Sequence, residues 1–167
     1  MKRAYLFLLI GIIFAHLHLN INNFDLLHDT LGYFLIFFGI VNLEREHSSS
    51  TLKKAELIAS ILLMIQMTSF IISPLLLQHP STLFLFNSLL VISQFILYEL
   101  ILYSQRKQTD TPFLRNLEKR YLLLGGAYLI FYFLASFIAE ITLLLLVSAF
   151  LYITYLIVAF YKLYKLN

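Results

Sequence analysis

Seven ionisable side chains fall at the ends of long apolar stretches, where they could act together chemically. They are four histidines and three carboxylates: His16, His18, Asp25, His28, Asp29, His79 and Glu140. Asp25 and Asp29 are four residues apart, so both would project from one face of a helix. With neighbouring imidazoles, these carboxylates could complete a metal, proton or cation site.

The same carboxylates also have a simpler structural use. Asp25 or Asp29 is well placed to cap the start of a helix, where a carboxylate accepts hydrogen bonds from free backbone amides and meets the positive end of the helix dipole. The sequence contains no His-x-x-x-His spacing, which would be a stronger indication of a metal site. We therefore favour capping for this cluster, and we expect no metal and no other cofactor.

A second set of polar side chains lies within the apolar stretches: Gln66, Asn87, Gln94, Glu99 and Tyr132. Most of them belong to polar stripes at helical spacing. The stripes are Gln66, Ser69 and Ser73; Asn87, Gln94 and Tyr98; Tyr128, Tyr132 and Ser136; and Ser148, Tyr152 and Tyr155. Such stripes either line a polar cavity or join helices by hydrogen bonds, and helix packing is the commoner use.

Glu99 is the one carboxylate clearly inside an apolar stretch, about one helical turn from its end at Tyr103. It could serve a proton or cation relay. It could also reach the headgroup layer and pair with Arg106 or Lys107, and we favour this second interpretation because the depth is shallow.

The elements that must position these residues are membrane helices. The chain has 167 residues, of which 60% are hydrophobic, only 13% are charged and none is cysteine. A soluble domain carries roughly 25% charged residues, so this composition excludes an ordinary soluble domain, a disulfide scaffold and a cysteine-ligated metal site. Six apolar stretches have about the length that crosses a bilayer. They are 4–19, 26–43, 55–77, 83–103, 121–138 and 141–161.

We therefore predict an all-α fold, a bundle of six transmembrane helices in a single domain over residues 1–167. The basic residues support this count, since cytoplasmic loops are rich in Lys and Arg. With the N-terminus inside, every one of the 12 basic residues falls on the inner side. They are Lys2 and Arg3; Arg45, Lys53 and Lys54; Arg106, Lys107, Arg115, Lys119 and Arg120; and Lys162 and Lys165.

Several local features follow from this topology. The chain must turn back between the fifth and sixth stretches, because one helix over both would run about 60 Å, and Glu140 marks the expected turn. Gly32 and Gly39 would form a groove for close helix approach, and Pro74 should kink or end the third helix. We expect a short interfacial helix over 113–120, and a first stretch retained as a signal anchor.

Around the second stretch the sequence reads LNINNFDLLHDTLGYFLIFFGIVNL. This segment resembles one that recurs in small multi-pass membrane proteins of Gram-positive bacteria (Firmicutes), with a pattern close to I-N-x-x-x-F-D-x-L-x-D-x-x-G-Y. The matching residues are Asn20, Asp25, Leu27, Asp29, Gly32, Tyr33, Gly39 and Leu43, whereas His28 replaces the usual proline and Thr30 the usual aromatic. The resemblance implies a bacterial plasma membrane and a bundle of five to six helices, and no particular chemistry.

Catalytic motifs are missing from the sequence: there is no G-x-S-x-G, no H-E-x-x-H and no glycine-rich phosphate loop. We expect an integral membrane protein with both termini cytoplasmic, in contact with lipid and with no role in nucleic-acid binding. A small transporter or channel-like bundle is the first functional hypothesis. An accessory protein that binds a membrane partner, a lipid or a second copy is the alternative. An enzyme centred on Asp25, His28 and Asp29 ranks third.

Overall fold

The computed structural model of the chain describes residues 1–16, 25–76 and 80–166. Within these ranges there are six α-helices and no strand, which confirms the predicted all-α class. The helices are α1 (Lys2–His16), α2 (Asp25–Glu46), α3 (Ser50–Leu76), α4 (Pro80–Gln108), α5 (Pro112–Ala135) and α6 (Thr142–Leu166). A short 3-10 helix, η1 (Ala139–Ile141), contains Glu140 and separates α5 from α6, so the predicted turn is confirmed.

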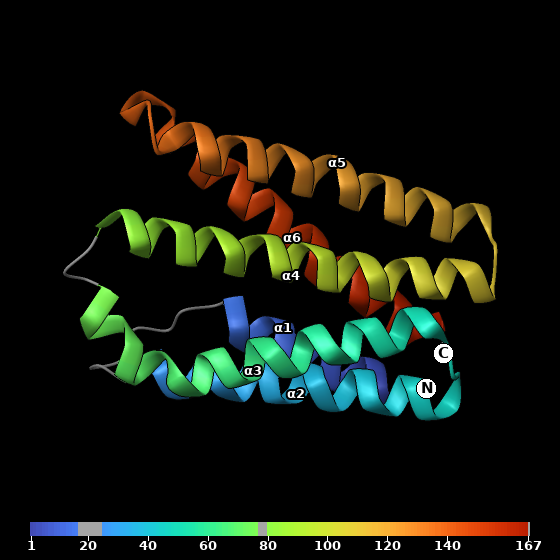
Figure 1. Cartoon of the computed structure of the whole chain (residues 1–167). Coiled ribbons are helices and arrows are strands. Elements are labelled where there is room, and N and C mark those ends of the chain that lie inside the picture. The colour runs from blue at the N-terminus through green and yellow to red at the C-terminus, as the bar shows by residue number, and fades with distance from the viewer. Residues whose placement is uncertain (17–24, 77–79, 167) are drawn as a thin grey trace.

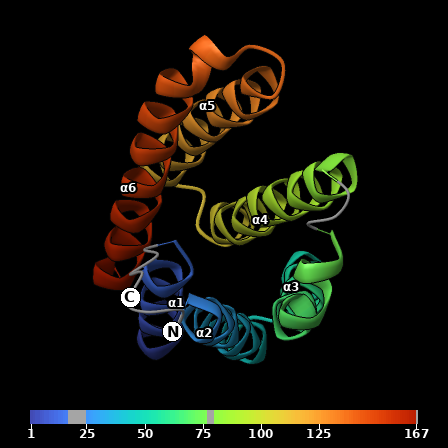
Figure 2. The same ribbon diagram turned by 90° about the vertical axis from the view of Figure 1, so that its left-hand side faces the viewer.

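Consecutive helices run in opposite directions, and each packs against its neighbours in the sequence (Figure 1). Contacts between α1 and α6 close this sequence of neighbours into a ring. Figure 2 looks along the bundle and shows the ring with α1 and α2 next to each other and α6 returning to α1. A closed ring lets all six described helices contribute side chains to a common centre.

One end of the bundle carries both termini and the connections α2–α3 and α4–α5 (Figure 1). All 12 Lys and Arg residues lie in the helix turns at this end or beside it, and we call it the basic end. Contacts across it include an ion pair between the Met1 ammonium and Glu46 and a Lys2 ammonium over the Tyr164 ring. The opposite end, which carries η1, is called the distal end.

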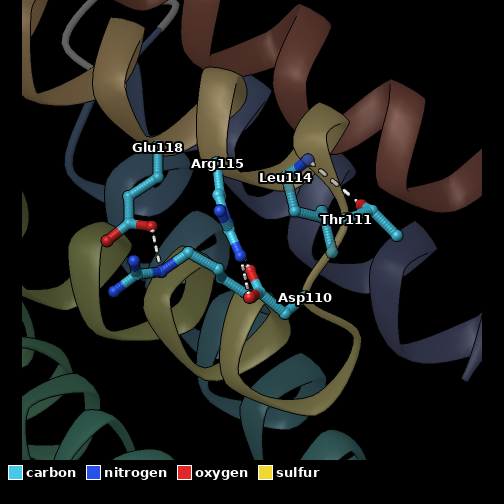
Figure 3. Close-up of polar contacts among 6 residues, drawn as sticks. Asp110, Thr111, Leu114, Arg115 and Glu118 are labelled. Atoms are coloured by element: carbon cyan, nitrogen blue, oxygen red, sulfur yellow. Dashed lines mark hydrogen bonds and ion pairs between the residues drawn. The ribbon is translucent and has the colours of Figure 1, made fainter.

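The start of α5 shows why the chain turns at the basic end (Figure 3). Thr111 is the N-cap of α5, its hydroxyl accepting from the Leu114 amide at 3.3 Å, and Pro112 follows at the first helical position. Asp110 pairs with Arg115. The helix then continues without interruption to Ala135, so the interfacial helix predicted over 113–120 is instead the first part of α5. By contrast, α3 ends at Leu76, two residues after Pro74, which agrees with the prediction that Pro74 would kink or end this helix.

Glycines bring α1 and α2 into close contact. A Cβ atom added at Gly32 would lie 2.6 Å from the backbone nitrogen of Ala15, and one added at Gly11 would lie 2.7 Å from the Gly32 carbonyl oxygen. A Cβ at Gly39 would lie 2.7 Å from the Leu8 side chain. The groove predicted at Gly32 and Gly39 is therefore confirmed, and α1 is the helix that lies in it.

The outside of the bundle is apolar. Phe137 is 83% exposed, Leu123 71% and Phe150 70%, and every helix of the bundle carries at least one exposed large apolar side chain. Two of the described helices, Ser81–Gln108 within α4 and Thr142–Leu166, are long and apolar enough to cross a membrane. The apolar exterior and these two helices indicate association with a membrane.

Candidate functional site

A polar cavity of about 370 Å³ lies inside the ring, toward the distal end, and all six described helices line it. Its lining residues are Ala15, His16, Asp29, Tyr33, Gln66, Asn87, Leu90, Val91, Gln94, Tyr128, Tyr132 and Ile153. The polar ones supply one carboxylate, one imidazole, three primary amides and three phenols. This mixture of many hydrogen-bonding groups with few charges suits a small polar ligand.

Three of the sequence stripes meet at this cavity. Asn87 and Gln94 line it from α4, Gln66 from α3, and Tyr128 and Tyr132 from α5. The seven-residue spacing of Asn87 and Gln94 places both on one face of α4. Four of the five polar residues singled out within the apolar stretches therefore share one cavity.

Two hydrogen bonds join opposite sides of the ring beside the cavity. The His16 Nε2 atom and the Tyr98 hydroxyl share a hydrogen bond of 3.1 Å between α1 and α4. The Gln94 amide donates to the Tyr33 hydroxyl between α4 and α2. These bonds fix the orientation of four side chains, three of which line the cavity itself.

The cavity is closed toward the basic end by packed side chains. Tyr98 lies one turn below Gln94 on α4, is 0% exposed, and its ring meets the Phe160 ring edge-on at 6.1 Å. Buried apolar residues such as Leu8, Ile101 and Leu156 fill the bundle beyond it. This packed layer separates the cavity in the distal half from the basic end.

Asp29 does not cap a helix, contrary to one of the two predicted capping positions. The structure begins α2 at Asp25, so Asp29 lies in the second turn, where its own backbone is already helical. From there its side chain lines the cavity together with Tyr33, four residues further along the same face. The predicted capping role is therefore wrong for Asp29, whose position one turn inside the helix makes it a cavity residue.

The predicted histidine and carboxylate cluster is only partly gathered by the structure. His16 and Asp29 line the cavity, whereas Glu140 is exposed on η1 at the distal end. His18 and His79 lie outside the described residues, and the side chains of Asp25 and His28 do too. Within the described part of the chain, no three His, Asp or Glu side chains come together as metal ligands would.

Glu99 lies apart from the cavity, toward the basic end. Its carboxylate is near the Glu118 carboxylate of α5 and within electrostatic range of Arg106. Arg106, one of the partners predicted for Glu99, forms its ion pair with Glu118, at 2.6 Å between the Arg106 Nε and the Glu118 Oε2 (Figure 3). The sequence suggested the correct cation, but the carboxylate that holds it comes from the next helix.

The stripe on α6 serves helix packing instead of the cavity. The hydroxyl groups of Tyr152 and Tyr121 share a hydrogen bond of 3.0 Å, and Tyr155 donates to the Leu117 carbonyl oxygen at 2.9 Å. Ser148 donates to the Leu145 carbonyl oxygen within its own helix. Both uses expected for polar stripes thus occur in this bundle, lining on α3 to α5 and packing on α6.

Tyr33 is the cavity residue that the sequence patterns did not single out. The signal that could have found it is its i,i+4 spacing from Asp29, which places both on one face of α2. Among the described lining residues there is no Lys or Arg, so Asp29 and His16 carry the only ionisable charge other than the phenols.

Comparison of the chain with family models, with curated proteins and with solved structures gives no match.

Proposed function

We propose that this chain is a six-span protein of a bacterial plasma membrane, with both termini in the cytoplasm, that binds and moves a small polar solute through its central cavity. The observation that carries the proposal is that six helices with an apolar exterior each contribute to one polar cavity. Polar side chains within a membrane are costly and mark solute or ion paths. A bundle that serves only as a packing partner has no need of such an interior.

The charge of the cavity favours a cationic solute over an anionic one. Asp29 supplies a carboxylate, Tyr33, Tyr128 and Tyr132 supply aromatic rings, and all Lys and Arg residues lie at the basic end. A carboxylate attracts a positive charge, and an aromatic face binds it through the ring quadrupole. We infer that a small organic ammonium ion is the chemical class that this lining suits.

Access from the distal side completes the proposal. The buried side chains around Tyr98 close the basic half, so a solute would enter from the distal end, which the positive-inside rule assigns to the outer face. Movement to the other side then requires the packing around Tyr98 and Phe160 to open. This is alternating access of the kind that polar cavities near the bilayer midplane provide.

The proposal is tested by measuring ligand binding to the protein in lipid nanodiscs. Tetramethylammonium should raise the thermal unfolding midpoint in a concentration-dependent way, and acetate should not. Asp29→Asn should weaken the affinity for tetramethylammonium about tenfold or more, since a hydrogen bond or contact to a charged group contributes about 1.5–3 kcal/mol. Higher concentrations of the ion should then be needed for the same rise in the midpoint. Glu140→Gln is the matched control, because this carboxylate is exposed on η1 and does not line the cavity. Equal stabilisation by acetate would contradict the proposal.

The binding assay, together with uptake of labelled choline into proteoliposomes, distinguishes the competing functional classes. If the wild type binds neither ion and only a co-purifying membrane protein stabilises it, the accessory role replaces transport. If Asp29→Asn binds tetramethylammonium but fails in proteoliposome uptake of labelled choline, Asp29 acts in movement of the solute and not in its recognition. An enzyme would be indicated by turnover of the choline probe, read by mass spectrometry of the vesicle contents.

A further inference from the structure

A groove smaller than the central cavity lies at the basic end between α5 and α6. It has a volume of about 180 Å³ and is lined by Phe113, Asn116, Leu117, Arg120, Tyr155 and Lys162. The hydrogen bond from the Tyr155 hydroxyl to the Leu117 carbonyl oxygen fixes the two helices at its base. Lys162 holds its ammonium group 5.9 Å from the centre of the Phe113 ring. The groove is therefore a built feature of the α5–α6 contact.

The two cations of this groove have no acidic partner among the described residues. Neither Arg120 nor Lys162 is within ion-pairing distance of a carboxylate there, whereas nearby Arg106 and Arg115 are paired with Glu118 and Asp110. Asn116 adds an amide to the same groove. Two unpaired cations with an amide donor form a site whose charge is complementary to a phosphate group.

The surface directly beyond the groove, toward the distal end, is apolar. Leu123 lies three residues after Arg120 on α5, and Val158 lies four residues before Lys162 on α6, so each continues the face that its cation occupies. Both are exposed, as is Leu151 further along α6. A positive groove at the end of an apolar face reproduces the order of a phospholipid, with its phosphate at the surface and its acyl chains toward the bilayer centre.

We propose that this groove is a binding site for one anionic glycerophospholipid of the cytoplasmic leaflet. Its phosphate lies between Arg120 and Lys162, and its acyl chains lie along the exposed faces of α5 and α6. The proposal rests on the membrane orientation proposed above but not on the solute cavity. Loss of lipid binding would therefore leave the binding of tetramethylammonium unchanged, and the two proposals can fail separately.

Native mass spectrometry of the protein released from nanodiscs tests the site. The nanodiscs contain equal amounts of phosphatidylglycerol and phosphatidylcholine. The wild type should retain one phosphatidylglycerol in preference to phosphatidylcholine. Arg120→Gln and Lys162→Gln should each weaken retention about fivefold, and the double variant about thirtyfold, as expected for removing cations beside an anionic lipid.

Lys119→Gln is the matched control, because it removes the same charge from the neighbouring position of α5 without lining the groove. Its retention of phosphatidylglycerol should equal that of the wild type, and circular dichroism should show the same helix content for all variants. Equal retention of both lipids by the wild type would overturn the proposal, as would equal losses in Lys119→Gln and Lys162→Gln. Displacement of the lipid by inorganic phosphate alone would assign the groove to a free anion instead.

Discussion

Tyr98 lies where the cavity is closed toward the basic end, and its hydroxyl shares a hydrogen bond with His16, which lines the cavity from the other side of the ring. Tyr98→Phe keeps the buried ring and its contact with Phe160 but removes that hydrogen bond. We expect a loss of about 1 kcal/mol in the free energy of unfolding, with weaker binding of tetramethylammonium because the His16 imidazole loses its hydrogen bond with Tyr98.

Tyr103→Phe on the same helix is the control for this substitution. Tyr103 is exposed and its ring contacts the Arg106 guanidinium, an interaction that phenylalanine preserves. Both variants are compared by thermal unfolding in detergent and by ligand titration. Identical behaviour of the two would mean that the His16–Tyr98 hydrogen bond does not support the cavity.

Charge pairs at the α4–α5 turn differ in burial, so they should differ in their contribution to stability. The Glu118 side chain is 9% exposed and the Arg106 side chain 35%, whereas Asp110 and Arg115 are 51% and 56% exposed. Arg106→Gln leaves Glu118 buried without its cation. We expect a loss of about 2 kcal/mol, less than for a fully buried pair because Arg106 is partly solvated.

Arg115→Gln is the comparison, and the thermal unfolding midpoint at neutral pH should hardly change. The hydrogen bond and charge of Arg115 hold the pKa of Asp110 below its usual value. A lowered pKa in the folded state stabilises the fold above the unfolded pKa, and this stabilisation is lost as the pH falls through the lowered value. The small stabilisation that Arg115 provides at neutral pH should therefore disappear in acid. A larger effect of Arg115→Gln than of Arg106→Gln would contradict this order.

At the scale of the elements, the contact between α1 and α2 depends on the absence of a side chain. Gly32→Ala would place a methyl group against the backbone of Ala15, and neither backbone can yield without moving a helix. We expect destabilisation of about 1–3 kcal/mol from overpacking, measured by the thermal unfolding midpoint. Gly126→Ala on α5 is the control, since its added methyl meets nothing within 4 Å. That variant should be as stable as the wild type or more so, because alanine favours helix by up to about 1 kcal/mol.

The boundaries of the elements could be predicted where apolar length decides them and not where polar residues join a helix. The segment around Arg115 and Lys119 predicts a separate interfacial helix, yet α5 begins there after the Thr111 cap and continues to Ala135, so one helix includes polar turns outside the apolar stretch. The same difficulty in placing the start of a helix applies to Asp29 at the site. Two carboxylates one turn apart can both cap a helix, and only the structure shows that Asp29 lies inside α2.

The arrangement of the elements was beyond reach of the sequence patterns. Spacing along α4 places Asn87 and Gln94 on one face, but it does not say which helices that face meets. The contact between α1 and α6 decides this, because it closes the ring and turns the faces of α3, α4 and α5 toward the same centre. Periodicity therefore identified most of the polar residues of the cavity, while long-range packing decided that those on α6 would instead serve the contact with α5.

At the scale of the whole molecule, the absence of native cysteine makes the proposed orientation directly measurable. Single cysteines are introduced at exposed positions at the two ends, Thr109→Cys at the basic end and Glu140→Cys on η1. In intact cells a membrane-impermeant maleimide should label Glu140→Cys and not Thr109→Cys. After permeabilisation both should react. Labelling of Thr109→Cys in intact cells would contradict a cytoplasmic basic end.

The contact between α1 and α6 also determines when the bundle can close during synthesis. During synthesis α1 and α2 can pair as soon as both have left the ribosome, but the ring cannot close until the last helix is made. Until then the amides of Asn87 and Gln94 and the carboxylate of Asp29 lack the enclosure that α6 completes. Nascent chains that end before residue 142 would therefore expose these groups to lipid. Quality-control proteases should remove such fragments, and the site should form only in the final step of biogenesis.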